Sequence, residues 1–266
     1  MLNIFKQEIV SHKKHLLLWS VGIIFLIVMG MAKMSAYHAS GESINKLFAE
    51  LPKVFKAITG ATGFDLSSAK GFFALLFLYI AVMVAIEAVL VGTEIVSKEE
   101  RDKTTEFLLT KPLTRTNILV SKILAGLVIV LVLSLVTTAS SLLIVGAYNQ
   151  GVSINYEILK LMGGMVFMQL VFYSVGLAIA ASSKKARSTT QIGSMIVLGA
   201  YLAFVLVGLF DSLNWLKYLT PFQYFEANTV LISGYSILSI GLSLLIIFVS
   251  LIVAIKMYSS RDQTLT

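Results

Sequence analysis

The stretch Phe72–Gly92, FFALLFLYIAVMVAIEAVLVG, decides the fold class, because it is apolar over the length of a membrane span. Crossing about 30 Å of hydrocarbon takes roughly 20 mostly apolar residues. Such a span must be a helix, since lipid offers no partners for free backbone groups. Five more stretches share this character: Leu16–Ala32, Ile123–Ala147, Leu161–Ala181, Ile192–Phe210 and Ser236–Ile255. The sequence therefore predicts an all-α membrane protein with six transmembrane helices.

The composition points to the same class. Hydrophobic residues make up 57% of the chain and charged residues 13%, against about 25% charged residues in soluble proteins. Six spans and their loops use residues 1–266, so we expect a single transmembrane domain without a separate soluble domain. A cleaved signal peptide is the alternative for the first span. That stretch is long, however, no A-x-A cleavage site follows Ala32, and its removal would leave an odd number of spans.

The distribution of charge predicts the orientation. If the N-terminus is cytoplasmic, the inner segments 1–15, 93–122, 182–191 and 256–266 hold 14 of the 21 Lys and Arg residues. An excess of basic residues on the cytoplasmic side is the rule for membrane proteins. The net charge of +7 then lies on the inner face. There it favours contact with anionic lipid, and nucleic acid is not an expected partner. Both termini are expected to be cytoplasmic.

Several kinds of catalytic site are excluded. The sequence has no cysteine, hence no disulfide and no thiol nucleophile. All of its histidines precede the second span: His12, His15 and His38. They cannot assist a membrane serine or complete a zinc site. Paired glutamates such as Glu99-Glu100 occur in membrane proteases of the CAAX type, but Thr104 stands where that chemistry needs an Arg. We expect no enzyme activity, no cofactor and no metal site.

Two amphipathic patterns lie outside the spans. In Met1–His15, apolar residues recur with helical spacing, which predicts a helix that lies along the inner surface and then turns into the first span. In the outer loop 33–71, apolar and charged residues alternate with helical spacing around Pro52. Proline kinks a helix or begins a new one. This loop is expected to form one or two helices that cap the bundle; a lid over an exit path is the alternative.

Aromatic residues crowd into the last outer loop, 211–235. They are Trp215, Tyr218, Phe222, Tyr224 and Phe225. Such residues concentrate at membrane–water interfaces, so a short interfacial or re-entrant helix with aromatic anchors is expected. The spans contain no GxxxG pair, although small residues such as Gly176 and Gly199 permit close helix packing.

The inner segment Thr93–Lys122, TEIVSKEERDKTTEFLLTKPLTRTNILVSK, is the most informative stretch outside the spans. Ser97 and Glu100 form a capping box, which predicts that a helix starts there. Opposite charges at i, i+4 support this helix, in Lys98–Asp102 and Glu99–Lys103. An apolar tip, Phe107–Leu109, follows, and Pro112 ends the helix. The segment would offer ionic and apolar contacts to a cytoplasmic partner; a solvated linker is the alternative.

The same segment resembles the pattern of ABC-2-type transporter permeases. Glu99–Leu109, EERDKTTEFLL, is followed by Lys111-Pro112-Leu113-Thr114-Arg115 and then by Lys122. Thr104 stands where the family usually has Gly, which leaves the helix break near residue 104 open. Weaker matches follow in family order: Lys184-Lys185-Ala186-Arg187, Leu219-Thr220-Pro221-Phe222 with Tyr224, and Ser260-Arg261-Asp262. The resemblance covers essentially the whole chain.

The resemblance implies the membrane permease subunit of an ATP-driven exporter in the cell membrane. Its partners would be two cytoplasmic ATPase subunits and a second copy of the permease or a related one. A coupling helix within 93–122 would dock on an ATPase, and Met1–His15 would form an elbow helix. The implied ionic contacts are Glu99, Glu100, Arg101, Glu106 and Arg115, and the implied apolar contacts are Phe107, Leu108 and Leu109. The chain has no G-x-x-x-x-G-K-[ST] motif, so another chain would bind ATP.

Glu87 is the sole ionisable residue inside the predicted spans. We interpret it as a partly hydrated carboxylate bonded to a neighbouring helix; a gate or a cargo contact is the functional alternative. Because the spans contain so few charged residues, the expected cargo is amphipathic or hydrophobic, such as a peptide, an antibiotic or a lipid-like molecule. Aromatic residues could line its path, although each is expected to face lipid: Phe72, Phe73, Phe77, Phe167, Phe172 and Tyr173. An ion-coupled secondary transporter or channel, or a sensing or immunity subunit, remains an alternative function.

Overall fold

Six long helices form the body of the protein. The computed structural model describes residues 2–40, 42–60, 63–102, 114–148, 153–183 and 186–260, apart from the side chains of 35–44 and 186. The long helices are α1 (Leu2–Ser40), α4 (Ala69–Arg101), α6 (Arg115–Tyr148), α7 (Asn155–Ser182), α8 (Thr189–Leu209) and α11 (Ile237–Ser260). Each covers one predicted span to within one residue. The predicted all-α class with six transmembrane helices is therefore confirmed.

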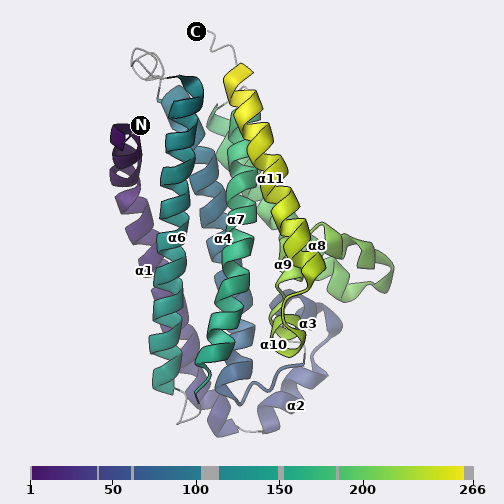
Figure 1. Ribbon diagram of the computed structural model, residues 1–266. Coiled ribbons are helices and arrows are strands. Elements are labelled where there is room, and N and C mark those ends of the chain that lie inside the picture. The colour runs from purple at the N-terminus through teal and green to yellow at the C-terminus, as the bar shows by residue number, and fades with distance from the viewer. Residues whose placement is uncertain are drawn as a thin grey trace.

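Helices α4, α6 and α7 form the centre of the bundle. Of their most apolar stretches, 61%, 56% and 67% are buried, against 17% for α1, 22% for α8 and 17% for α11. Figure 1 shows α1 beside α6, and α11 beside α7. Large apolar side chains on the peripheral helices are exposed, for example Phe25 on α1 and Phe248 on α11. Such faces suit contact with lipid.

Both ends of the described chain lie at the same end of the bundle (Figure 1). We call it the termini end; it holds Leu2, the C-terminus of α4, the N-terminus of α6 and Ser260. The short helices α2, α3 and α10 lie at the opposite end. An even number of spans brings both termini to one side, in agreement with the six predicted helices.

The central helices α4 and α7 approach each other closely at two glycines. A Cβ atom on Gly176 of α7 would lie 2.6 Å from the carbonyl oxygen of Val89 and 3.2 Å from the Cα of Gly92 on α4. A Cβ atom on Gly92 would collide with the carbonyl oxygen of Tyr173. Small residues at such crossings are a common device of membrane helices, since they let two backbones touch.

Two short helices, α2 (Glu42–Glu50) and α3 (Lys53–Thr59), follow α1 at the opposite end. Pro52 is the N-cap of α3, so of the two predicted alternatives, a kink or a new helix, the structure shows the second. Proline fits there because the first residues of a helix need no intrahelical N–H bond. The predicted loop is shorter than expected, since α1 continues to Ser40.

The aromatic loop 211–235 contains three short helices: η2 (Asp211–Tyr218), α9 (Pro221–Tyr224) and α10 (Ala227–Ser233). Trp215 and Tyr218 are exposed, as interfacial anchors would be. Phe222 and Phe225 are instead buried, and the ring centroid of Phe222 lies 5.5 Å from that of Phe172 on α7. The expectation that all of these aromatics are interfacial is therefore wrong for the buried ones.

The aromatic residues of the spans also differ from expectation. Those predicted to face lipid are largely buried: Phe72, Phe73, Phe77, Phe172 and Tyr173, with Phe167 half-buried against the same core. The three on α4 lie on the helix at the centre of the bundle. The sequence could not reveal this, because a central span is apolar on all faces and its periodicity does not distinguish lipid from protein.

The N-terminal segment differs from the predicted elbow helix. Helix α1 runs unbroken from Leu2 to Ser40, so the expected turn between residue 15 and the first span is absent. The sequence Met1–Leu16 has no Gly or Pro that would end a helix. Ile4, Glu8 and His12 are buried, which places one face of this segment against the bundle.

Candidate functional site: a buried ion cluster at the termini end

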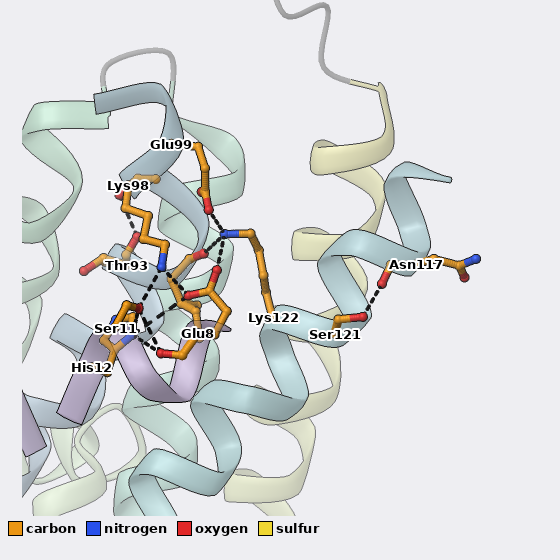
Figure 2. A network of polar contacts seen from close by, with 11 residues as sticks. Glu8, Ser11, His12, Thr93, Lys98, Glu99, Asn117, Ser121 and Lys122 are labelled. Atoms are coloured by element: carbon orange, nitrogen blue, oxygen red, sulfur yellow. Dashed lines mark hydrogen bonds and ion pairs between the residues drawn. The ribbon is translucent and has the colours of Figure 1, made fainter. Parts of the chain in front are cut away.

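A buried lysine lies at the centre of a polar network where α1, α4 and α6 meet (Figure 2). Lys122 of α6 is fully buried. Its Nζ donates to Glu8 Oε1 at 3.0 Å, to Glu99 Oε1 at 2.5 Å and to the carbonyl oxygen of Ile95 at 2.7 Å. An ammonium group has three N–H donors, so its hydrogen-bonding capacity is used in full.

Glu8 of α1 is the second buried member of the network. Its side chain is 3% exposed, and both of its oxygens have a lysine partner, since Lys98 Nζ of α4 donates to Oε2 at 2.5 Å. Lys98 also donates to Ser11 Oγ at 3.0 Å. His12 Nδ1 lies 2.9 Å from the carbonyl oxygen of Glu8, which can only accept, so the ring donates. Glu8, Lys98, Glu99 and Lys122 form what we call the ion cluster.

The ion cluster fixes three helices to one another. Two carboxylates face two ammonium groups, so the cluster is neutral as a whole. Removing ions from water is costly, and a buried ion pair is retained only where its hydrogen bonds are satisfied, as they are for Lys122. Loss of one partner leaves an uncompensated charge in the interior. The cluster therefore favours one relative arrangement of α1, α4 and α6.

The end of α4 differs from the predicted coupling helix. Helix α4 continues to Arg101, and Asp102 is its C-cap, so Ser97 lies inside a helix and does not start one. The Ser97 hydroxyl donates to the carbonyl oxygen of Thr93 at 2.7 Å, a bond that Ser makes within helices. Lys98 bonds to Glu8 rather than to Asp102. The capping box at Ser97 was thus a wrong prediction, because apolar packing extends α4 past it.

The predicted coupling residues lie in three different environments. Glu99 is turned towards Lys122, with 15% of its side chain exposed. Glu100 and Arg101 are exposed, and Arg101 lies 3.6 Å from Glu94 Oε1 and 3.2 Å from Asp102 Oδ1. Arg115 is half-buried at the start of α6. Four predicted contacts lie outside the described residues: Glu106, Phe107, Leu108 and Leu109.

Glu87 is placed differently from its predicted environment. It is fully buried in α4, and neither carboxylate oxygen has a hydrogen bond within the described chain. An ionisable neighbour is His15 of α1, whose Nε2 lies 3.9 Å from Oε1. That distance is too long for a hydrogen bond. The expected partly hydrated carboxylate bonded to a neighbouring helix is therefore a wrong prediction.

Sequence reasoning missed Glu8 and Lys98 as site residues, and it quoted Lys122 only as part of a family pattern. A signal was available. Glu8, His12 and His15 recur at i, i+4 and i+7, which places three polar residues on one face of a helix. Such a face next to an apolar span predicts polar partners within the bundle. Among the residues that the structure describes, no three His, Asp or Glu side chains gather to hold a metal ion.

A comparison with known protein families shows where this chain belongs. Residues 2–263 match the sequence model of the family described as ABC-2 family transporter protein. This chain belongs to the ABC-2 transporter family. The match covers nearly the full length of the ABC-2 protein, and the six helices support its role as a multi-pass transport permease. The ABC-2 permease has no match among curated proteins.

Proposed function

We propose that this ABC-2 permease is the membrane subunit of an ATP-driven exporter. Two separate ATPase subunits would supply the energy, and a second permease, identical or related, would complete the pathway. The single observation that carries the proposal is the ion cluster. It joins the C-terminal end of α4 and the N-terminal end of α6, the two helices that flank residues 103–113, to α1. An ABC permease needs such a junction, because its ATPases must move the spans from outside the membrane.

The charge distribution supports a cytoplasmic position for this junction. Residues 1–15 and 93–122 together hold nine Lys and Arg residues, and the described parts of both segments, 2–15, 93–102 and 114–122, lie at the termini end. Basic residues favour the cytoplasmic side. In the cell membrane, the ATPases would then meet the permease at the end that carries Arg101 and Arg115, with both termini on the same side.

The coupling step follows from this placement. ATP-driven closure of the ATPases would displace the segment between α4 and α6. Glu99, bonded to Lys122, would transmit the displacement within the permease, while the exposed Glu100 and Arg101 would contact the ATPase. We assign Arg115 and Glu106 to further ionic contacts, and Phe107–Leu109 to apolar contacts. Since α1, α4 and α6 share the cluster, they would tilt together.

The cargo is proposed to be amphipathic or hydrophobic. The ion cluster satisfies its own charges, and the described core of the bundle is dominated by apolar side chains. A strongly charged solute would lose its hydration in such a path without compensation. Glu87 is the candidate gate or cargo contact within the spans. Transport of a small inorganic ion as cargo would count against this assignment.

Replacing Glu100 and Arg101 together with Ala tests the coupling role. We expect the double variant to fold, because both side chains are exposed and surface ion pairs contribute about 0–1 kcal/mol. We expect it to lose most of the ATPase that co-purifies with the wild-type permease. Thermal unfolding in detergent verifies the fold, and co-purification of ATPase measures the coupling.

A matched control is available at the opposite end of the bundle. Lys70 and Glu157 are exposed or half-buried and lie 3.4 Å apart, so the Lys70→Ala/Glu157→Ala variant removes one acidic and one basic residue elsewhere. It should retain the ATPase. If the Glu100→Ala/Arg101→Ala variant retains as much ATPase as this control, the two residues do not take part in docking.

A further inference from the structure

The interior of the bundle contains one pair of ionisable groups that the coupling mechanism does not use. Glu87 is fully buried and both of its oxygens lack a hydrogen bond in the described chain; the Nε2 of His15 is likewise buried without one. The two groups face each other at 3.9 Å from α4 and α1. Unpaired buried polar groups are costly, and proteins retain few of them. Ionisable residues in membrane spans commonly bind ions or relay protons.

We propose that Glu87 and His15 form a proton-binding site within the membrane bundle, where the pair holds one exchangeable proton. With one proton, the pair is neutral overall, whether the proton is on the carboxyl group or on the imidazole. With none, it carries a negative charge, and with two, a positive charge. A buried net charge is disfavoured in an apolar bundle. The single-proton form is therefore the stable one, and the site exchanges that proton with solvent. This inference goes beyond the proposed export function, since the site would exist with or without an ATPase.

Other charged groups around the pair are already engaged. On α4, Glu94 lies two turns from Glu87, pairs with Arg101 and also interacts electrostatically with His15. On α6, Lys122 is held by Glu8 and Glu99. On α7, Tyr173 Oη donates to the carbonyl oxygen of Ile123 at 2.7 Å. Helix α8 has no charged residue between Thr189 and Leu209, and its Tyr201 donates to the carbonyl oxygen of Ile58. His15 is thus the ionisable group that faces Glu87.

A polar face of α1 connects the pair with the termini end. The rings of His15 and His12 have their centroids 6.3 Å apart, and His12 contacts the Glu8 carbonyl group within the network of Figure 2. His15 keeps 22% of its side chain exposed. The proposed route of the proton therefore runs along this face of α1 from the termini end.

Infrared difference spectroscopy on the full-length chain in lipid nanodiscs tests the site. Between acidic and alkaline pH, the wild-type chain should show a change in the carboxylic acid or imidazolium bands that Glu87→Gln removes. The bands should shift in D2O, because the proton exchanges. Glu157→Gln, at a partly exposed carboxylate, is the matched control and should leave the Glu87-dependent change intact.

The His15→Gln variant provides an independent arm. It should move the pH midpoint of the Glu87-dependent change, because His15 shares the proton; an unmoved midpoint would exclude His15 from the site. Identical spectra for wild type and Glu87→Gln over the whole pH range would overturn the proposal, and so would a band that does not shift in D2O. If Glu87→Gln fails to fold, His15→Gln is compared directly with the wild type, and pH-dependent carboxylic acid and imidazolium bands that His15→Gln leaves unaltered overturn the pair.

Discussion

Replacement of Lys122 with Met should destabilise the folded permease by about 3–5 kcal/mol, the usual cost of removing one partner from a buried ion pair. Met retains the length of the side chain and its apolar part, so the variant isolates the charge and its three hydrogen bonds. Glu8, whose side chain is 3% exposed, would keep Lys98 as the partner of Oε2 but lose the partner of Oε1. The carbonyl oxygen of Ile95 would also lose its donor. Unfolding of the purified chain in detergent measures the effect.

Lys70→Met is the matched control for this substitution. Lys70 pairs with Glu157 at 3.4 Å, but 47% of its side chain is exposed. An exposed pair contributes about 0–1 kcal/mol, so this variant should unfold close to the wild type. Equal destabilisation by Lys122→Met and Lys70→Met would contradict the role that we assign to the ion cluster.

A double variant tests whether the destabilisation by Lys122→Met comes from an unpaired buried charge or from poorer packing. In Glu8→Leu/Lys122→Met, the two most buried charges of the cluster are removed together, and Lys98 and Glu99 retain opposite charges. Replacing a buried pair with apolar groups is often neutral. The double variant should therefore be more stable than Lys122→Met alone. Additive losses would show that the two side chains are not coupled.

Replacement of Gly176 with Ala should destabilise the α4–α7 crossing by about 1–3 kcal/mol, the usual cost of overpacking. The added methyl group would lie 2.6 Å from the carbonyl oxygen of Val89, and a backbone atom cannot rotate away as a side chain can. Helices α4 and α7 would have to separate at the centre of the bundle. Thermal unfolding in detergent measures the loss.

Gly199→Ala on α8 is the control for the glycine prediction. No atom lies within 4 Å of the position of its Cβ. Ala favours a helix over Gly by about 1 kcal/mol, so this variant should be neutral or slightly more stable than the wild type. If Gly176→Ala unfolds at the same temperature as Gly199→Ala, the close approach of α4 and α7 is not required for stability.

Much of the architecture followed from the sequence. The six spans are defined by length and apolarity alone, because the membrane imposes both. Pro52 marked the start of α3 for a local reason, its missing N–H group. The sequence did not reveal which small residues lie at a helix crossing. Gly176 does, whereas Gly199 faces open space. That difference depends on which helices are neighbours.

The site was harder to predict for the same reason. Glu99 and Lys122 were recognised as parts of one segment, but their mutual bond is a contact between two helices. Glu8 belongs to the segment that was predicted to lie along the inner surface, but because α1 is unbroken, Glu8 faces the bundle. Ser97 matched a capping pattern, yet α4 continues past it because the preceding turns are buried in the bundle. Local patterns found the spans, while the partners of each charge depended on tertiary packing.

The most direct test of the proposed function is to purify the tagged chain from its native cells in mild detergent and to identify bound proteins by mass spectrometry. An ABC-type ATPase in stoichiometric amount is the predicted result, and its loss in the Glu100→Ala/Arg101→Ala variant should follow. A chain that purifies alone, or only with copies of itself, would contradict the ATP-driven permease and favour an ion-coupled carrier or a channel.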